Sequence, residues 1–529
     1  MNTPEGSHQS KIVELMQDPN FYSPPVDSVS LRETHISVVF LTGDVVYKIK
    51  KPVDMNFLDF STLEKRRHFC YQEVELNRRL TRNVYLDVVP ITFQQDQYDL
   101  GGSGRPVEYA VKMRQLPHRA TMIKLLRRGE LDRKRIARLA QVLSQFYERA
   151  KTGGQIDSCG SQTTIRKNCE ENFMQLKEFA GKVISLQMLL FVRSTTRSFL
   201  NRRKMLFKRR IDNGKIRECH GDLRAGHIYF TKDGIQIIDC IEFNERFRYN
   251  DVASDLAFLA MDLDFEGFST EGQDLLKSYV TASDDADVYI LMNFYKSYRA
   301  LVRVKVNCLR LRQNDLGEAQ RTQLLMETQR YMELAYQYAE QFARPTVWVV
   351  CGMAASGKST IAKVMTQKLD IKMLSSDLIR KELFADRLPQ DQLAFREGIY
   401  SKEATSITYG KLLRLAQEEI DQQDSVILDA TFGRKHHRRK VLRLAEELDA
   451  NVVFIECTSS DPVIKRRLKN RDIRPSISDA RLEHFENLKD AYEPLDDIPQ
   501  DIHITVDTQE SLKDNIKLIL SQEDLPIAG

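Results

Sequence analysis

The sequence lacks the features that mark secreted and membrane-bound proteins. Its eight cysteines are scattered and form no C-x-x-C pair, which favours a reducing compartment over a disulfide framework. Residues 1–9 are polar and contain no apolar core of the kind found in signal peptides. Apolar runs such as residues 183–192 are too short to cross a bilayer. We therefore expect a cytoplasmic protein with no membrane-embedded part.

A strong net charge is also missing. The chain has 79 Lys and Arg against 75 Asp and Glu, and its net charge of +4 argues neither for nor against a nucleic-acid partner. Its 529 residues are too many for one hydrophobic core, so we expect several domains. The predicted domains are residues 1–116, 117–344 and 345–529.

One motif is present in full. An apolar run at residues 347–351 leads into a glycine, four further residues, Gly357-Lys358-Ser359 and then a helical apolar pattern. This is G-x-x-x-x-G-K-S/T between a strand and a helix, where backbone N–H groups and the helix N-terminus bind phosphates. An ordinary glycine turn is the alternative, but motif and context agree. The residues expected to bind ATP are Gly352, Ala354, Ala355, Ser356, Gly357, Lys358, Ser359 and Thr360, with the Ser359 hydroxyl on Mg²⁺.

Strands and helices alternate after this motif. The alternation predicts a parallel sheet between helices, with ligands at the carboxyl ends of the strands. Asp377 and Asp429 each follow such a strand, and Arg380 comes three residues after Asp377. A carboxylate in the position of Asp429 orients Mg²⁺ or its water. The alternatives are that Asp377 caps a helix and Asp429 caps a turn.

The first 116 residues predict a small sheet with one helix. Residues 36–41 and 45–50 read as a hairpin across a Thr-Gly-Asp turn. Because side chains alternate along a strand, Lys48 and Lys50 share one face of its second strand. We expect this hairpin to present a lysine to a ligand.

Helices are predicted for residues 61–80, where Ser61 is the expected N-cap and Glu73 lies inside, and for most of the segment 117–344. The latter contains a strongly basic run at residues 201–210. A solvated helix face is the usual meaning of such a run, and contact with an anion or RNA is the alternative.

Two short motifs interrupt the helical segment. His220-Gly221-Asp222 opens a loop, and Ile237-Ile238-Asp239 ends a second hairpin. Together they resemble the catalytic loop and metal-binding strand of the aminoglycoside phosphotransferase-like kinases, which share the protein-kinase fold. A phosphoryl-transfer site needs one carboxylate for the nucleophile and another for the metal, which agrees with the resemblance. A plain turn at His220 is the alternative.

The resemblance covers roughly residues 30–340. It implies that Asp222 accepts the proton of the substrate hydroxyl and that Asp239 holds Mg²⁺ at the phosphates. It also implies that Lys48 contacts the phosphates and pairs with Glu73.

Two points stay open in this half. Lys48 is preferred to Lys50 as the phosphate lysine because of its strand face and the family alignment. His227 stands where the family has an asparagine that serves as a second metal ligand, and imidazole is a poor partner for a hard Mg²⁺ ion. Either another residue supplies an oxygen, or this half is a weak or inactive kinase.

The segment after residue 345 resembles the P-loop kinases of small molecules and nucleic-acid ends, the group with polynucleotide kinase and chloramphenicol phosphotransferase. The resemblance implies that Asp377 activates the acceptor hydroxyl and that Arg380 steadies the acceptor or the transferred phosphoryl group. It also implies that Arg467 and Arg471 are lid arginines that close over ATP. A solvated helix face is the alternative for these two arginines.

The whole chain resembles a bacterial family in which these two modules are fused. The implied fold is a bilobal, α+β protein-kinase-like domain with its N-lobe at 1–116 and C-lobe at 117–344, followed by an α/β P-loop domain. The implied function is transfer of the γ-phosphoryl group of ATP, with Mg²⁺, to a hydroxyl of a small molecule, with two ATP sites. The alternatives are an ATP-dependent switch with a non-catalytic kinase-like module and a nucleic-acid-end kinase.

Overall fold

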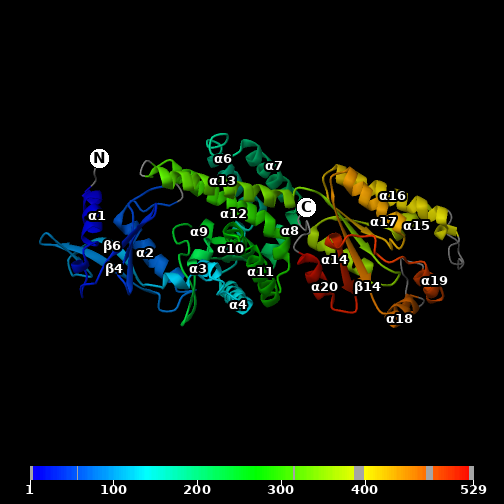
Figure 1. The fold of residues 1–529 in the computed structure, drawn as a ribbon, viewed down its shortest axis with the longest axis horizontal. Coiled ribbons are helices and arrows are strands. Elements are labelled where there is room, and N and C mark those ends of the chain that lie inside the picture. The colour runs from blue at the N-terminus through cyan, green and yellow to red at the C-terminus, as the bar shows by residue number, and fades with distance from the viewer. Residues whose placement is uncertain (1–3, 56–57, 314–315, 386–397, 472–479, 523–529) are drawn as a thin grey trace. The chain divides into compact units, whose positions relative to one another are not determined.

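The computed structural model describes residues 4–55, 58–313, 316–385, 398–471 and 480–522 (Figure 1). The chain forms two compact units. Both units take up parts of segment 117–344, so the domain boundaries at residues 116 and 344 stay a prediction. The first unit consists of Met1–Thr164 and Arg210–Asp284, and the second of Ile165–Arg209 and Asp285–Gly529.

The first unit contains an antiparallel sheet of six strands in the order β1-β2-β3-β6-β4-β5. The predicted hairpin is confirmed as β2 and β3. Tyr47 and Ile49 of β3 pack on the side of α1, and Val46 packs on the side of α2. Lys48 and Lys50 alternate with the first pair and so point toward α2. The elements are α1 (Pro4–Leu15), β1 (Ser30–Glu33), β2 (Ser37–Leu41), β3 (Val45–Lys50), β4 (Tyr85–Gln94), β5 (Gln97–Leu100) and β6 (Arg105–Arg114).

Helix α2, Leu63–Asn77, is shorter than the predicted helix 61–80. Thr62 is its N-cap, and the prediction of Ser61 in this role is wrong. Ser61 instead donates from its backbone N–H and its hydroxyl to Asp59, at 3.0 and 2.6 Å. These hydrogen bonds hold Ser61 in a local turn with Asp59, so the helix is capped one residue later, at Thr62.

The rest of the first unit is mainly helical and holds two short antiparallel pairs, β7 with β10 and β8 with β9. The second pair is the predicted hairpin before Asp239. Helix α10 is buried along nearly its whole length, so its carboxylates require partners. The elements are α3 (Met122–Arg127), α4 (Arg133–Arg149), α5 (Gln155–Cys159), β7 (Ile216–Glu218), β8 (Ile228–Thr231), β9 (Gly234–Ile237), α9 (Glu245–Arg248), β10 (Tyr249–Asp251), α10 (Val252–Glu266) and α11 (Ser269–Ser283).

The second unit opens with a group of helices in which α12 packs along α13 and α7 packs on α13. Aromatic rings fill its core: Phe199 stacks on Phe294 with centroids 4.8 Å apart, and Phe342 meets both rings edge-on. The helical character predicted for most of segment 117–344 is confirmed in this part. The bounds are α6 (Gln162–Leu176), α7 (Leu186–Arg202), α8 (Lys204–Asp212), α12 (Asp287–Leu311) and α13 (Glu318–Gln341).

The predicted parallel sheet is confirmed in the second unit, with five strands in the order β12-β13-β11-β14-β15. Every residue of the central strand β11 is buried, as its apolar, β-branched sequence predicts. The strands are β11 (Thr346–Cys351), β12 (Lys372–Ser375), β13 (Val426–Asp429), β14 (Asn451–Thr458) and β15 (His503–Asp507). The helices are α14 (Lys358–Leu369), α15 (Ser376–Leu383), α16 (Lys402–Asp421), α17 (Lys435–Glu447), α18 (Asp461–Arg471), α19 (Phe485–Asp490) and α20 (Leu512–Leu520).

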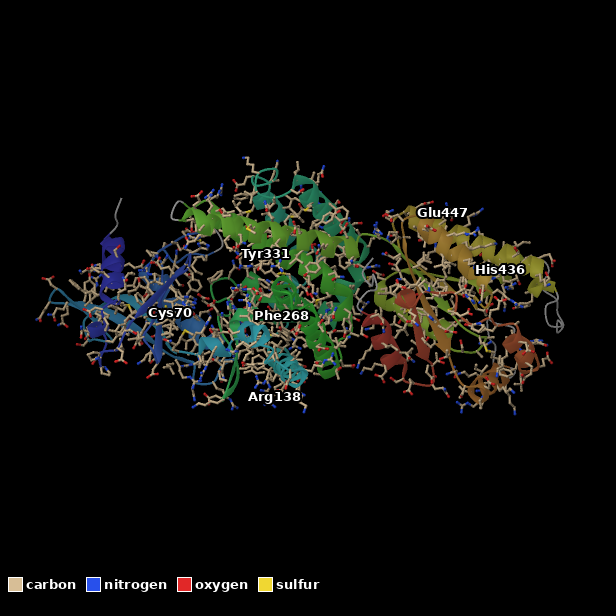
Figure 2. The ribbon with its side chains drawn as sticks, viewed as in Figure 1. Cys70, Arg138, Phe268, Tyr331, His436 and Glu447 are labelled. Carbon is tan, nitrogen blue, oxygen red and sulfur yellow. The ribbon has the colours of Figure 1, made fainter. Side chains whose placement is uncertain are left out.

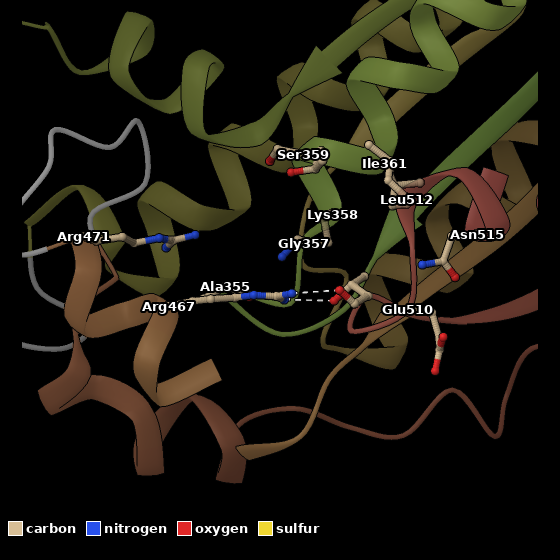
Figure 3. Close-up of a pocket in the computed structure, with 12 residues that line it drawn as sticks. Ala355, Gly357, Lys358, Ser359, Ile361, Arg467, Arg471, Glu510, Leu512 and Asn515 are labelled. Atoms are coloured by element: carbon tan, nitrogen blue, oxygen red, sulfur yellow. Dashed lines mark hydrogen bonds between the residues drawn. The ribbon is translucent and has the colours of Figure 1, made fainter. Parts of the chain in front are cut away.

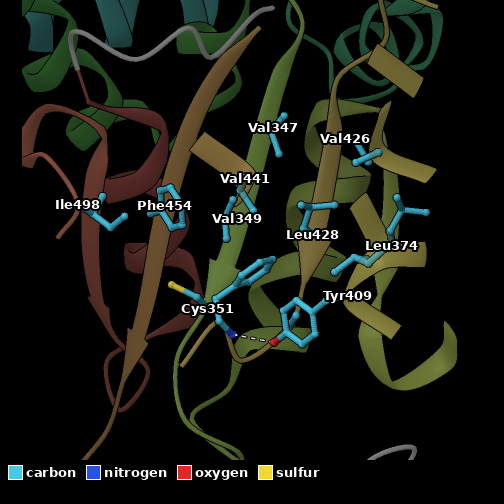
Figure 4. Close-up of a cluster of buried hydrophobic side chains, with 14 of the residues drawn as sticks. Val347, Val349, Cys351, Leu374, Tyr409, Val426, Leu428, Val441, Phe454 and Ile498 are labelled. Atoms are coloured by element: carbon cyan, nitrogen blue, oxygen red, sulfur yellow. Dashed lines mark hydrogen bonds between the residues drawn. The ribbon is translucent and has the colours of Figure 1, made fainter. Parts of the chain in front are cut away.

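Helices cover both faces of this sheet. Val347 and Val349 of β11 meet Tyr409 of α16 and Val441 of α17 in one buried cluster (Figure 4). Helix α14 lies against β11 and β13 and packs on α20. The arrangement leaves the carboxyl ends of the strands open for the loops that follow them.

The basic run 201–210 is not a solvated helix face. Arg203 and Arg210 are only 4% and 1% exposed. Arg203 donates to the carbonyl oxygen of Leu369 at 2.7 Å, and Arg209 donates to two more carbonyls of the last turn of α14 at 2.9 and 2.7 Å. Arg203 and Arg209 therefore cap the carboxyl end of α14, the helix that follows the phosphate-binding loop.

All eight cysteines carry free thiols. Seven are buried, among them Cys70 on α2 (Figure 2). Within the ranges that the structure describes, no helix combines the length and the apolar character needed to span a bilayer.

Candidate active sites

The phosphate-binding loop joins the end of β11 to the start of α14. Gly352 has φ +131°, and a Cβ there would lie 2.3 Å from the carbonyl oxygen of Cys457, so only glycine fits. Gly357 has φ +101° and packs against Thr508. Ala355, between them, has φ +64°. These left-handed residues curl the backbone in front of the helix N-terminus, the geometry of an anion-binding hollow.

Lys358 is the first residue of α14 and reaches back over this loop. Its Nζ donates to the carbonyl oxygen of Met353 at 2.7 Å. Burial lowers the pKa of Lys358, and the nearby Asp429 carboxylate opposes that effect. A phosphate oxygen would be a stronger acceptor for the ammonium group than this neutral carbonyl.

Asp429 ends β13 and lies beside the loop because β13 is the neighbour of β11. Its Oδ2 accepts a hydrogen bond from the hydroxyl of Ser359 at 2.7 Å. Burial raises the pKa of Asp429, and the charge of Lys358 opposes that rise. A hydroxyl and a carboxylate are the hard oxygen ligands that Mg²⁺ takes together with phosphate oxygens and water, so this pair fits the ion.

A pocket of about 300 Å³ opens at the loop (Figure 3). Arg467 and Arg471 line it from α18, and Thr508 lines it from the segment after β15. Arg467 donates to the carbonyl oxygen of Ala355 at 3.2 Å and to the side chain and carbonyl of Thr508, both at 2.9 Å. Nη1 of Arg471 is buried without a hydrogen-bond partner in the described chain. Both arginines thus face the pocket, and the solvated-face alternative does not hold.

Asp377 lies in the first turn of α15, but Ser375 occupies the N-cap position. The capping alternative for Asp377 is therefore wrong. The charge of Asp377 raises the pKa of Lys358, opposing the effect of burial, and raises the pKa of Asp429, adding to the effect of burial. Asp377 therefore lies within electrostatic reach of the loop. The Asp377 carboxylate is half-buried.

Arg380 is predicted to steady the acceptor or the transferred phosphoryl group, and in the structure its side chain contacts other parts of the chain. It is 6% exposed, and its Nη1 donates to the carbonyl oxygen of Ile399 at 2.7 Å. Its guanidinium lies 4.8 Å from the ring centroid of Tyr400 and 3.4 Å from the hydroxyl of Thr405. In the structure Arg380 braces α15 against the start of α16.

The second candidate site lies in the first unit, on the loop that begins at His220. Helix α10 anchors this loop. Asp255 accepts the backbone N–H groups of His220 and Gly221 at 2.9 and 2.8 Å, and Asp262 accepts that of Ala225 at 2.9 Å. Because the two carboxylates are seven residues apart, they lie on one face of the helix. The loop is therefore fixed through its backbone.

Asp222 is bound by Arg224 through two parallel hydrogen bonds, from Nε at 3.0 Å and from Nη2 at 2.9 Å. The same Nη2 lies 3.0 Å from Nε2 of His227, whose Nδ1 lies 3.0 Å from the carbonyl oxygen of Asp222. A guanidinium only donates, so Nε2 accepts and Nδ1 carries the proton. Burial, helped by the charge of Arg224, lowers the pKa of His227 to about 4, and the ring is neutral.

Lys48 lies between two carboxylates. Its Nζ is 2.8 Å from Oε1 of Glu73 on α2 and 2.8 Å from Oδ1 of Asp239. Burial alone would lower the pKa of Lys48, but Asp239 and Glu73 raise it. Burial alone would likewise raise the pKa of Asp239, but Lys48 holds it well below its usual range. Lys48 thus pairs with Glu73, as the resemblance implies, and also meets Asp239.

Lys50 belongs to the same network. Its Nζ is 2.8 Å from Oε2 of Glu73, contacts Glu242 and lies 4.9 Å from the ring centroid of Phe60. Glu73 therefore bridges both lysines. Lys48 is the one that meets Asp239, and Lys50 is a fully buried support behind it.

Sequence reasoning missed Arg224, Glu242 and Asp255 in this site. Arg224 and Glu242 stand two and three residues after the predicted carboxylates, so the motifs could have been read further along the chain. Asp255 gives no local signal, because it acts on backbone groups 35 and 34 residues away.

The chain thus combines an α+β unit, in which Lys48, Asp222 and Asp239 lie, with a P-loop domain built on a parallel sheet. The family model described as "AAA domain" matches residues 347–495. The uncharacterized protein Rv2004c of Mycobacterium tuberculosis is 32% identical over 446 residues, which is 84% of this chain and 86% of that protein. The uncharacterized protein Mb2027c of Mycobacterium bovis matches equally. The chain belongs to the family of these mycobacterial proteins.

The chain is also similar to proteins with kinase names. L-seryl-tRNA(Sec) kinase of Methanococcus maripaludis is 26% identical over 176 residues, 32% of this chain and 61% of that protein. A solved choline/ethanolamine kinase family protein from Mesorhizobium loti covers 62% of this chain and 99% of its own, with 12% identity and a TM-score of 0.37. The Mycobacterium tuberculosis APS kinase CysC, in complex with AMPPNP and APS, covers 34% and 97%, with 19% identity and a TM-score of 0.27.

Proposed function

We propose that this protein is an ATP-dependent kinase that transfers the γ-phosphoryl group to a hydroxyl of a small molecule. The observation that carries the proposal is the meeting of Lys358, Ser359 and Asp429 at a curled glycine loop. The network of Lys48 and Asp239 supports a second ATP site of the same chemistry. The free, mostly buried thiols support the cytoplasm as its compartment.

At the P-loop site, the loop N–H groups and Lys358 would bind the β and γ phosphates. Ser359 and Asp429 would hold Mg²⁺, which supplies charge neutralisation at the phosphate oxygens when bound. Arg471, whose Nη1 is buried without a partner in the described chain, would donate to the transferred group. Arg467 would keep the loop in shape and contact the nucleotide beside it.

The acceptor hydroxyl needs a base in each site. Asp377 would accept its proton at the P-loop site, and Asp222 would do so at the kinase-like site. In both transfers the bond from the γ phosphorus to its bridging oxygen breaks and a bond from the acceptor oxygen forms. The acceptor proton passes to the aspartate, and ADP leaves. Arg380 would steady the acceptor or the transferred phosphoryl group, and its contact with the carbonyl oxygen of Ile399 would hold it in place.

In the kinase-like site, Lys48 would contact the nucleotide phosphates, and Glu73 and Lys50 would hold Lys48 in place. Asp239 would hold Mg²⁺, because its carboxylate is kept ionised beside Lys48. The predicted role of His227 as a metal ligand does not fit, because its Nε2 faces the guanidinium of Arg224. A metal ion at that position would be repelled by the positive charge of Arg224.

The proposal is tested with the full-length protein, γ-labelled ATP and a pool of small metabolites. We expect labelled product from the unaltered chain. Lys358→Ala should lower the transfer made at the P-loop site by about 10²- to 10³-fold, since it removes a phosphate-binding cation. The double variant Lys358→Ala, Asp222→Ala should transfer nothing, and Lys440→Ala, an exposed lysine of α17, is the control. Tight ATP binding without any labelled product would instead indicate a nucleotide-dependent switch.

The similarity to L-seryl-tRNA(Sec) kinase favours a second candidate, in which the hydroxyl is carried by a nucleic acid. The basic run no longer supports it, because Arg203 and Arg209 bind carbonyls of α14. Incubation with labelled ATP and total tRNA, together with RNA binding measured against salt, separates the candidates. Labelled RNA and a steep loss of binding with salt would favour the nucleic-acid acceptor.

A further inference from the structure

Arg224, two residues after Asp222, places a cation inside the kinase-like site. The guanidinium of Arg224 holds both carboxylate oxygens of Asp222 and touches Nε2 of His227. The side chains of Arg224 and Asp222 are each 25% exposed, so the pair is partly accessible to solvent. A permanent positive charge thus lies beside the proposed base.

A second metal ion does not fit this arrangement. Its expected ligand, His227, offers one lone pair, and that lone pair points to a guanidinium nitrogen 3.0 Å away. A metal ion bound there would have to displace Arg224, and imidazole is a weak ligand for a hard Mg²⁺ ion. The other nitrogen of the ring faces the carbonyl oxygen of Asp222 at 3.0 Å and, as the protonated one, has no lone pair to offer.

The position of Arg224 is fixed by its surroundings. The loop that carries it is held by Asp262, which accepts the backbone N–H of Ala225, the next residue. Its fork geometry matches a carboxylate, and it matches a phosphoryl group equally well because both present paired oxygens. Arg224 can therefore exchange the carboxylate of Asp222 for phosphate oxygens without leaving the site.

We propose that Arg224 takes the place of the second metal ion in the kinase-like site, so that this site binds ATP with one divalent cation and Arg224 binds the transferred phosphoryl group. The proposal rests on the proposed ATP site at Lys48. Release from Arg224 would at the same time free Asp222 to accept the acceptor proton. His227 is then a positioning residue, which keeps the guanidinium turned toward the phosphate.

The number of metal ions can be counted directly. The full-length Lys358→Ala variant is titrated with Mn²⁺ and a non-hydrolysable ATP analogue, and free Mn²⁺ is read by electron paramagnetic resonance. We expect about one Mn²⁺ per bound nucleotide, against about two for a two-metal kinase site. The rebuilt variant Arg224→Ala, His227→Asn should bind about two, since it restores the usual oxygen ligand and removes the cation.

Nucleotide affinity gives an independent readout. Arg224→Ala should weaken binding of the triphosphate analogue by about 10- to 100-fold, because a charge-assisted contact to the γ phosphate is lost. ADP binding should change by less than about 3-fold, since ADP has no γ phosphate. Arg224→Lys keeps the charge but loses the forked guanidinium geometry. Its affinity for the triphosphate analogue should lie between those of the unaltered chain and Arg224→Ala. A merely structural role would weaken both nucleotides equally and lower the unfolding temperature.

The outcomes separate this inference from the function beneath it. If Lys48→Ala in the Lys358→Ala background leaves nucleotide binding unchanged, the kinase-like unit has no ATP site, and the proposed second ATP site fails together with the role of Arg224, whereas the P-loop kinase proposal stands. If Lys48→Ala abolishes binding but two Mn²⁺ ions bind per nucleotide with Arg224 present, the ATP site stands and only the role of Arg224 is refuted. Equal losses for triphosphate and diphosphate would refute it too.

Discussion

At the scale of single residues, Gly352 is the position with the least tolerance for change. Its φ of +131° and the carbonyl oxygen of Cys457, 2.3 Å from where a Cβ would lie, exclude any side chain. Gly352→Ala should destabilise the P-loop domain by about 4 kcal/mol, from backbone strain and overpacking together. The fluorescence of Trp348, the single tryptophan and a fully buried residue of β11, reports unfolding of this domain in urea.

Gly410 provides the matched control. It lies within α16, and a Cβ added there meets no atom within 4 Å. Gly410→Ala should stabilise the same transition by up to about 1 kcal/mol, because alanine favours helix over the unfolded chain. Equal midpoints for both variants would show that the contact with Cys457 does not constrain the loop.

His437 makes the stability of this domain depend on pH. It is 7% exposed and stacks on Tyr409 with ring centroids 3.8 Å apart. Burial, and then the charge of His436, lower the pKa of His437 to about 4. An unfolded histidine has a pKa of about 6.5 and takes up its proton first. Stability is therefore complete above that value and falls as the pH drops toward 4.

His437→Phe keeps the stacked ring and removes the proton site. Between pH 6.5 and 4 we expect the variant to lose about 2 kcal/mol less stability than the unaltered chain. Urea unfolding followed by Trp348 fluorescence at several pH values measures the difference. His436→Gln, at the exposed neighbour, is the comparison and should reduce the pH dependence only in part, because it removes the lesser cause of the low pKa of His437. An unchanged pH dependence in His437→Phe would contradict the assignment.

At the scale of elements, the carboxyl end of α14 is held by groups from distant parts of the sequence. Its carboxyl end receives hydrogen bonds from Arg203 and Arg209. Asp287 of α12 joins the same cluster, 3.1 Å from Arg209 and 2.6 Å from Lys368. Positive groups at a helix carboxyl end satisfy its carbonyls and its dipole.

Removal of this cap should loosen the phosphate-binding helix. Arg203→Ala and Arg209→Ala should each destabilise the domain by about 1–3 kcal/mol, because carbonyls and, for Arg209, the carboxylate of Asp287 lose a charged donor. Trp348 fluorescence in urea again gives the measurement. Lys204→Ala, an exposed lysine of the same run, should stay within about 0.5 kcal/mol of the unaltered chain. Equal effects at all three positions would argue against a specific cap.

These elements also show how far the sequence predicts the structure. The phosphate-binding loop was predictable because strand, loop and helix are consecutive, and each glycine has a local backbone reason. The start of α2 was missed because Asp59 takes the hydrogen bonds of Ser61. The cap on α14 was not predictable, since Arg203 and Leu369 are 166 residues apart and no pattern links them.

The kinase-like site was predicted in part for the same physical reason. Asp222 and Asp239 sit in short motifs with a local signature, so they could be found by reading the chain. Strand alternation alone places Lys48 and Lys50 on one face, and the family resemblance favoured Lys48. That Lys48 meets Asp239 and Lys50 meets Glu242 is decided by the fold.

At the scale of the whole molecule, the two proposed nucleotide sites draw on different units of the chain. Lys48 belongs to the first unit and Lys358 to the second. If both sites bind ATP, equilibrium dialysis with a non-hydrolysable analogue should give about two nucleotides per chain, and each single alanine variant about one. The double variant should bind none.

The affinities measured in that experiment also test whether the two sites are coupled. When two sites share no residues, substitutions in one leave the affinity of the other unchanged within about 0.5 kcal/mol, and binding free energies add. A change of more than about fivefold at the intact site would correspond to a coupling of about 1 kcal/mol, the range of allosteric linkage. Such coupling would have to be reciprocal, so Lys48→Ala and Lys358→Ala must then shift each other's site by the same factor. An unequal shift would mean that one variant has damaged its neighbour's fold, which thermal unfolding of each variant would reveal.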